Sequence, residues 1–380
     1  MGAIAQPPLA GVRVVEASSW VSGPYAGLML ADLGAEVIKV EPPTGDPFRR
    51  FRRPTTPVSA EFANCNRGKR SVALDLKSPA DRQALLDLVA QSDVFMCNWR
   101  PDVADRLRLG DAALAAANER LIRVYITGYG AAGPEAGAPA FDSVVQARSA
   151  LCHAGSPDGT PVLLPGYPVD KTTGILAAQA VLAGLFARER DGSGERIDIA
   201  MLDVAAYVDF VELFANRTFV EGQPEEATNV QATSLRPLPA SDGWLVLAPV
   251  SGAQVGALCR AVGHPEWVDE LRAQPTAAES AALLFERLER VLRGRPQAEW
   301  LALFDAHDVP AAPCLTIDEH LADPQVAHNE IYELDDWPGM GPVRTVRYPA
   351  LFARRGPLRA ATSPPELGEY DLEGSGGTDV

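Results

Sequence analysis

Short runs of β-branched and other apolar residues alternate with segments of helical spacing over roughly the first two hundred residues. This alternation is the pattern of a parallel sheet whose strands are joined by crossover helices. The runs are Val12–Val15, Val37–Val40, Val72–Leu76, Asp93–Cys97 and Leu121–Ile126. We therefore predict an α/β fold in which a Rossmann-like large domain is built on a parallel sheet.

Two helices in this region carry their own boundary signals. Ser78 is a favoured N-cap residue and Pro79 suits the first helical position, so they predict a helix over Pro79–Ala90. A second, longer helix is predicted from about Lys171 to Arg190, because Gly192 follows it as a stop signal.

The pattern changes near residue 221, where a polar, proline-containing passage begins. An isolated strand, Trp244–Val250, is followed by three amphipathic helices, which predicts a smaller α+β domain. The helices are expected at Ser251–Val262, Ala277–Leu292 and Pro296–Ala306. We expect the N-terminal part of the large domain at 1–205, the small domain at 225–325, and a return to the large domain with the C-terminal tail at 335–380.

The formal net charge of −16 opposes any broad nucleic-acid or anionic-membrane surface, since such partners are bound by accumulated Lys and Arg. Cations nevertheless gather locally: between Arg49 and Lys77 there are eight of them against two acids. Such a cluster is often an ordinary solvated face. It would also suit one compact polyanion, such as a nucleotide with several phosphates, and the charge pattern alone leaves both readings open.

The sequence gives no support for a secreted, membrane-spanning, disulfide-rich or metal-binding protein. The start of the chain lacks the basic and apolar regions of a signal peptide, and no later stretch reaches ~18 unbroken apolar residues, so we expect a cytoplasmic protein. The five cysteines are scattered without a C-x-x-C motif, and the five histidines form no H-E-x-x-H motif. We expect neither a disulfide framework nor a metal site.

One motif imitates a dinucleotide-binding fingerprint. The segment Gly128–Gly133 reads G-x-G-x-x-G directly after a predicted strand. That fingerprint requires a helix to open at the third glycine, but Pro134, Gly137 and Pro139 follow at once. We therefore predict a glycine-rich loop and no NAD site.

Asp170 lies at the start of the long predicted helix, after a loop that contains Pro168. Aspartate is a preferred N-cap residue, which would explain its presence without any chemistry. An aspartate ionised at neutral pH can also attack an activated acyl carbon without a general base. Spacing alone leaves both readings open.

A series of motifs in one order extends over nearly the whole chain. The segments are Pro8–Val15, Ser22–Pro24, Leu30–Glu41, Gly45–Asp46, Asn66–Ser71, Leu74–Lys77, Asn98–Pro101, Thr127–Gly130, Phe141–Asp142, Asp170 and Gly192–Glu195. With these motifs the chain resembles the family III CoA-transferases, also called the CaiB/BaiF family. The resemblance implies a large domain built from both chain ends, a smaller middle domain, and two subunits interlinked as a homodimer.

The resemblance also implies a site. Family members bind coenzyme A along the large domain and use the aspartate that matches Asp170 to form acyl-anhydride and aspartyl-CoA intermediates. The positions that match the coenzyme A site are Ser22, Leu74, Lys77, Asn98, Trp99 and Arg106. Under this reading the basic cluster would bind the coenzyme A phosphates, the acyl-CoA and a carboxylic acid would be the substrates, and no metal would be needed.

Phe141 and Asp142 are expected in the substrate pocket. Family epimerases of 2-methylacyl-CoA have a histidine immediately before the aspartate that matches Asp142, and this chain has Phe141 there. Without that imidazole, two-base proton exchange is disfavoured relative to CoA transfer. Epimerisation, an intramolecular CoA shift and a non-catalytic CoA-binding protein remain the alternatives.

Overall fold

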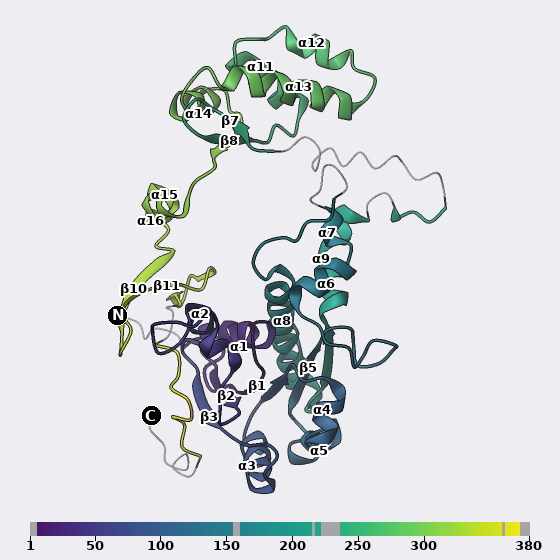
Figure 1. Cartoon of the computed structure of the whole chain (residues 1–380), viewed down its shortest axis with the longest axis vertical. Helices are drawn as coiled ribbons and strands as arrows, with labels where there is room; N and C mark the ends of the chain where they lie inside the picture. The colour runs from purple at the N-terminus through teal and green to yellow at the C-terminus, as the bar shows by residue number, and fades with distance from the viewer. Residues whose placement is uncertain (1–5, 155–159, 215–216, 222–235, 359–361, 373–380) are drawn as a thin grey trace. The chain divides into compact units, whose positions relative to one another are not determined.

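The computed structural model describes residues 6–154, 160–214, 217–221, 236–358 and 362–372 (Figure 1). The chain divides into two compact units. Unit 1 comprises Met1–Leu151, Leu163–Asp209 and Glu330–Val380, and unit 2 comprises Cys152–Val162 and Phe210–Asn329. Within the described ranges, no helix combines the length and the apolar character that crossing a membrane requires.

Unit 1 is built on a six-stranded sheet of order β3-β2-β1-β4-β5-β6, in which every neighbouring pair is parallel. The strands are β1 (Arg13–Ala17), β2 (Glu36–Glu41), β3 (Arg70–Ala73), β4 (Val94–Cys97), β5 (Ile122–Thr127) and β6 (Arg196–Ala200). The strand order reverses between β1 and β4, and α/β sheets bind ligands beside the carboxyl ends of the strands at such a point. The α/β, Rossmann-like prediction is confirmed. The sixth strand was missed, because exposed charged residues interrupt its apolar pattern.

Helices lie between these strands, and one more follows the last of them. They are α1 (Ser22–Asp32), the 3₁₀ helix η1 (Pro47–Arg50), α2 (Ala60–Asn66), α3 (Pro79–Ala90), α4 (Pro101–Arg106), α5 (Asp111–Ala117), α6 (Asp142–Arg148), α7 (Leu151–Ala154), α8 (Pro168–Asp191) and α9 (Met201–Leu213). Helix α3 has the predicted bounds, and the Ser78 side chain accepts a hydrogen bond from the amide of Asp81. Helix α8 begins at Pro168, earlier than predicted, so Asp170 lies within its first turn.

Buried apolar side chains form one cluster on each face of the sheet. Leu30 of α1 and Val181 of α8 pack with Val14 in one cluster, whereas Leu85 of α3 packs with Ile38 in the other. Helices α1 and α8 also approach each other closely at Gly174. A Cβ atom added to Gly174 would lie 2.9 Å from the backbone oxygen of Ser22 and 3.1 Å from the side chain of Tyr25. Only glycine allows this approach without displacement of α1.

Unit 2 contains a three-stranded antiparallel sheet and a layer of helices around Leu258, Leu288 and Phe304. Its strands are β7 (Leu238–Pro239), β8 (Trp244–Leu247) and β9 (Ala311–Pro313). Its helices are α11 (Gly252–Ala261), α12 (Trp267–Arg272), α13 (Ala277–Leu292), α14 (Gln297–Ala306), α15 (Ile317–Ala322) and α16 (Pro324–His328). Capping boxes at Ser251 and Thr276 fix the starts of α11 and α13.

The C-terminal part of unit 1 forms two small hairpins. Strands β10 (Tyr332–Trp337) and β11 (Gly341–Val346) pair antiparallel, as do β12 (Leu351–Phe352) and β13 (Gly356–Pro357). The last described segment then runs along β3, where the amide of Tyr370 donates to the carbonyl of Ser71 at 2.8 Å. The final residues of the expected tail, 373–380, lie outside the described ranges.

Candidate active site

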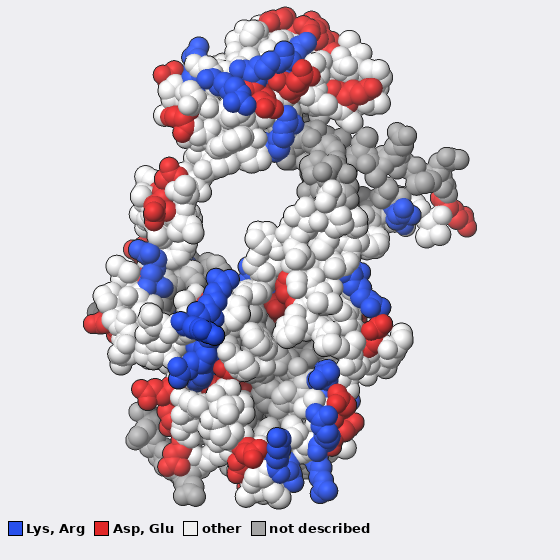
Figure 2. Space-filling model, in the orientation of Figure 1, with Lys and Arg blue, Asp and Glu red and all other residues white. Residues whose placement is uncertain are grey.

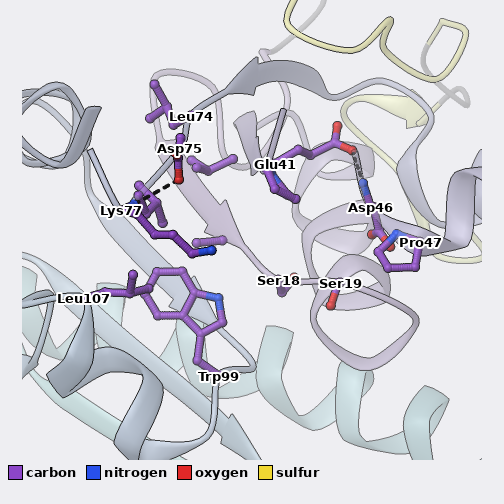
Figure 3. Close-up of a pocket in the computed structure, with 14 residues that line it drawn as sticks. Ser18, Ser19, Glu41, Asp46, Pro47, Leu74, Asp75, Lys77, Trp99 and Leu107 are labelled. Carbon is purple, nitrogen blue, oxygen red and sulfur yellow. Dashed lines mark hydrogen bonds between the residues drawn. The ribbon is translucent and has the colours of Figure 1, made fainter. Parts of the chain in front are cut away.

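A cavity of about 310 Å³ opens in unit 1 where β1, β2, β3 and β4 end (Figure 3). Its lining includes Ser18 and Ser19 after β1, Asp46 and Pro47 after β2, Leu74, Asp75 and Lys77 after β3, and Trp99 and Leu107 after β4. Figure 3 shows the Trp99 indole and the Lys77 side chain on one side of this hollow, facing Asp46 and Pro47 across it. The hollow thus offers a flat aromatic surface beside an exposed cation.

A second cavity, of about 490 Å³, shares Ser19 and Trp99 with the first. Its wall also includes Trp20, Ser22, Asn98, Arg100, Gly128, Phe141 and Asp170. The glycine-rich segment contributes to it as a loop, in agreement with the prediction that no helix opens there. A carboxylate, an aromatic cluster and a helix N-terminus therefore meet around one hollow.

The predicted site residues are distributed over these two cavities. Leu74, Lys77 and Trp99 line the first, and Ser22, Asn98, Trp99, Phe141 and Asp170 line the second. Arg106 and Asp142 line neither of the two. Arg106 is exposed on α4 and pairs with Asp102 at 3.0 Å. Asp142 is 5% exposed, and its side chain accepts the backbone amide hydrogen of Asp170.

Asp142 caps the helix that carries Asp170. The N-cap residue of α8, Tyr167, provides no side-chain cap, and Oδ2 of Asp142 accepts the amide N–H of Asp170 at 3.0 Å instead. Oδ1 of Asp142 accepts a hydrogen bond from Gln146 Nε2 at 2.5 Å. Gln146 Oε1 in turn accepts the amide of Leu164 at 2.9 Å. The first residues of α6 and α8 are thus tied together, and the sequence held no signal for this connection.

The carboxyl group of Asp170 is half-buried and accepts hydrogen bonds from both the hydroxyl and the amide of Ser22, the first residue of α1. Burial raises the pKa of Asp170 to about 7, and the negative charge of Asp142 adds to the rise, whereas the two bonds from Ser22 oppose it. The expectation that this aspartate is fully ionised at neutral pH therefore needs correction. Around neutral pH, both the protonated and the ionised form of Asp170 are therefore present.

Four charged side chains form a buried ion network beneath the loop that follows β1. Lys39 Nζ lies 3.1 Å from Glu16 Oε1 and 3.1 Å from Asp46 Oδ2, and it donates to the carbonyl of Ser18 at 2.9 Å. Lys69 Nζ donates to Glu16 Oε2 at 2.5 Å. The side chains of Glu16, Lys39 and Lys69 are 0% exposed, so their charges are compensated within the protein.

This network and two further pairs correct the interpretation of the basic cluster. Lys69 is buried against Glu16, Arg49 against Glu41 at 2.7 Å, and Arg67 against Asp32 at 3.0 Å. These three cations stabilise the fold and are not available to phosphates. The exposed members are Arg50, Arg52, Arg53, Arg70 and Lys77. Figure 2 shows Lys and Arg side chains gathered in the part of unit 1 where Figure 1 places α2.

The pairing of Glu16 with Lys39 was not predicted from the sequence. Both are charged residues inside otherwise apolar strands, and charges in such positions are rarely fully buried unless they are paired. That pattern could have indicated a buried ion pair. It could not have identified Lys69 and Asp46 as the other members.

Comparisons with known proteins identify the family of this chain. The chain is 33% identical over 385 residues to a probable fatty acyl-CoA transferase of Mycobacterium tuberculosis, and the match covers 96% of each protein. It is 33% identical over 392 residues to a succinate–glutarate CoA-transferase of Agrobacterium fabrum, which covers 97% of this chain and 95% of the relative.

Solved structures show the same similarity. The crystal structure of the M. tuberculosis protein matches with a TM-score of 0.83 at 32% identity and covers 96% of this chain and 98% of that one. A CaiB/BaiF family protein from Brucella suis matches with a TM-score of 0.81 at 29% identity and covers 96% of this chain and 97% of that one. The family model described as CoA-transferase family III matches residues 9–371. The resemblance drawn from the sequence motifs is confirmed, and this chain belongs to CoA-transferase family III.

Proposed function

We propose that this protein transfers coenzyme A from an acyl-CoA to a free carboxylic acid through covalent intermediates on Asp170. One observation carries the proposal: the Asp170 carboxyl group lines a cavity, accepts two hydrogen bonds from Ser22, and has a pKa of about 7. A carboxyl group with this pKa can attack as the carboxylate and can also leave readily from an anhydride. The CoA-transferase names of the relatives support the same reaction class.

The first cavity is proposed to hold part of the coenzyme A. Trp99 and Leu74 offer apolar surface to an adenine or a pantetheine chain, and the exposed Lys77 offers positive charge to phosphates. Arg106, which lies outside the cavity wall on α4, is proposed as a further phosphate contact. Asn98 is proposed to act through the loop after β1. Its Oδ1 accepts the amide of Ser19 at 3.1 Å, and its Nδ2 donates to the carbonyl of the same residue at 2.7 Å. Its amide group is therefore already engaged by the backbone.

The donor half of the proposed reaction has two steps. A carboxylate oxygen of Asp170 attacks the thioester carbonyl, the C–S bond breaks, and a mixed anhydride and a CoA thiolate result. The thiolate then attacks the aspartyl carbonyl carbon, the anhydride C–O bond breaks, and the donor acid leaves as a carboxylate. Asp170 is left as a thioester of coenzyme A. The amide of Ser22 at the N-terminus of α1 would stabilise the oxyanions that develop.

The acceptor half reverses these steps. The acceptor carboxylate attacks the carbonyl carbon of the aspartyl thioester, and the C–S bond breaks. A second anhydride, between the acceptor acid and Asp170, forms as the CoA thiolate leaves. The thiolate attacks the acceptor carbonyl, which yields the new acyl-CoA and regenerates the Asp170 carboxylate. The four steps consume no water and need no metal or redox partner. The apolar and aromatic wall around Asp170 would protect the anhydrides from hydrolysis.

A homodimer is proposed from the exposed apolar face of α8. Ile175, Leu182 and Phe186 lie along one side of this helix and are 47%, 37% and 68% exposed. Contiguous exposed apolar residues of this size mark interaction surfaces. The family resemblance adds that the two subunits are interlinked.

Incubation of the purified chain with a panel of acyl-CoAs and free acids, followed by mass spectrometry of the CoA esters, tests the proposed reaction. New CoA esters should form with the wild type and with Asp87→Ala, which alters an exposed aspartate, and not with Asp170→Ala. Full transfer by Asp170→Ala would contradict the mechanism.

The alternatives predict different outcomes of the same incubation. An epimerase needs no acceptor and would exchange the α-hydrogen of 2-methylacyl-CoA with deuterium oxide. With Phe141 in place of a base, we expect no such exchange. A binding protein would form no new ester with any pair.

A further inference from the structure

Trp20 has a left-handed backbone, with φ of 67°. A bulky residue in this region is strained, and such strain persists only where the surroundings over-determine it. The non-glycine residues with positive φ in the described ranges are Trp20, Arg52, Arg53, Arg108, Ala150, Asp308 and Glu330. Of these, only Trp20 lines either of the two cavities.

Each residue around Trp20 is held by a different side chain. The carbonyl of Ser18 accepts from Lys39, and the amide and carbonyl of Ser19 both bond the side chain of Asn98. The amide of Trp20 faces Asp46 Oδ1 at 3.4 Å, and the same oxygen accepts the amide of Phe48 at 2.9 Å. The loop therefore cannot relax to remove the strain without breaking several bonds.

Two of the residues that support this loop, Lys39 and Asp46, belong to the buried ion network. Lys39 and Asp46 contact the loop directly, Glu16 pairs with Lys39, and Lys69 pairs with Glu16 in turn. The loop also lies close against α1: a Cβ atom at Gly23 would lie 2.3 Å from Ser18 Oγ. Removal of one member would leave a buried charge without its partner, so the network fixes a single loop conformation.

This conformation brings the Trp20 indole into an aromatic cluster beside Asp170. The ring meets Phe141 edge-on, at 5.8 Å between centroids and 85°, and it meets Phe51 at 6.1 Å and 85°. It also contacts Phe48 at 5.7 Å, and Phe48 is only 1% exposed. Trp20 therefore has a buried ring behind it and no space to withdraw from the pocket.

We propose that Trp20 is a specificity-determining residue, which together with Phe141 forms a rigid wall that limits the size of the acyl group reaching Asp170. This inference rests on the proposed function and deepens it. The wall is rigid because the ion network fixes its backbone and Phe48 supports its ring. Compact acyl groups fit beside it, whereas bulky ones such as benzoyl are excluded by the indole.

Self-exchange assays test this proposal without knowledge of the natural acid pair. The rate at which labelled acetate, butyrate or benzoate enters its own CoA ester is measured for the wild type, Trp20→Phe and Trp20→Gly. Glycine removes the indole and tolerates the left-handed backbone. The benzoate-to-acetate rate ratio should rise at least about tenfold in Trp20→Gly and less in Trp20→Phe, since pocket shape discriminates by about 10- to 200-fold. The control is Phe352→Leu, which alters a ring of β12 that lines neither cavity, and it should keep the wild-type ratio.

A merely structural role for Trp20 gives a different result. All three exchange rates would then fall by the same factor in both variants, together with the temperature of unfolding, and the inference would be overturned. If Trp20→Gly does not fold, the ratio in Trp20→Phe decides, since that variant retains an aromatic ring in the cluster. Absence of exchange of every acid by the folded wild type would instead contradict the proposed function itself.

Discussion

Oδ2 of Asp142 accepts the amide hydrogen of Asp170 at 3.0 Å, so a buried carboxylate on α6 caps the first turn of α8. The same carboxylate places a negative charge near the carboxyl group of Asp170. It therefore holds the proposed nucleophile in position and at the same time makes its ionisation less favourable.

The Asp142→Asn substitution separates these two effects. The amide oxygen of the new side chain can still accept the bond from Asp170, but the charge is gone, although the bond from Gln146 is lost. In the wild type kcat/KM should rise with pH and level off above about 7, as Asp170 ionises. In Asp142→Asn the midpoint of this rise should move to lower pH, by about 1 on the pH scale. Identical pH profiles for the two proteins would contradict this account of the pair.

The raised pKa of Asp170 also affects stability. The folded chain holds this proton more tightly than the unfolded chain, so the contribution of Asp170 to stability is largest below about pH 4 and declines as the pH rises to about 7. Asp170→Asn should remove this decline. The free energy of unfolding, measured at several pH values with denaturant, should therefore favour the variant over the wild type most strongly above pH 7.

Gly174→Ala should damage both stability and activity. The added Cβ would lie 2.9 Å from the backbone oxygen of Ser22, so α1 must shift and the bonds from Ser22 to Asp170 must lengthen. We expect a loss of about 1–3 kcal/mol in the free energy of unfolding and a fall in kcat. Gly252→Ala is the control, since a Cβ there meets nothing within 4 Å and should change the stability by about 0.5 kcal/mol or less. Equal effects of the two substitutions would mean that the close approach of α1 and α8 is unimportant.

Glu16→Gln should be strongly destabilising. It leaves Lys69, whose pKa burial already lowers to about 8, without its acidic partner, and it weakens the neutralisation of Lys39. We expect a loss of about 3–5 kcal/mol in the free energy of unfolding, measured by denaturant titration. Glu135→Gln removes an acid from an ion pair with Arg148 in which both side chains are 40–50% exposed, and it should cost less than about 1 kcal/mol. A loss below about 1 kcal/mol for Glu16→Gln would show that the network is not needed for folding.

Phe186→Glu tests the proposed dimer. A charge on the exposed apolar face of α8 should weaken association, because it would have to be buried without a partner. Sedimentation velocity should give a dimer for the wild type and a larger monomer fraction for the variant at the same concentration. Ala112→Glu, on the exposed surface of α5, should remain dimeric. A monomeric wild type would contradict the dimer.

Much of the large sheet could be predicted because each strand is a local run of apolar residues. Helix α3 was predictable from Ser78 and Pro79 for the same reason: its signals are adjacent in sequence. The ion network was not predictable, because Glu16 and Lys69 are far apart in the chain and meet only after β1, β2 and β3 assemble. The basic cluster was therefore overestimated as a phosphate site.

The site also has features that local sequence predicts and features that form only when distant residues meet. Asp170 could be proposed from its place near a helix start and from the family motifs. Its raised pKa could not, since it depends on burial and on Asp142, which lies on another helix. The left-handed backbone of Trp20 was equally invisible, because no residue type in the segment after β1 requires it.

Transfer of a heavy-oxygen label tests the central claim most directly. When the acceptor acid is labelled in its carboxylate oxygens, the bridging oxygen of the second anhydride stays on Asp170 after the thiolate attacks the acceptor carbonyl. Mass spectrometry of the peptide that contains Asp170 should show the label after turnover, and the donor acid released in later cycles should carry it as well. If new acyl-CoA accumulates while this peptide remains unlabelled, Asp170 does not form the anhydride, and the proposed mechanism is contradicted.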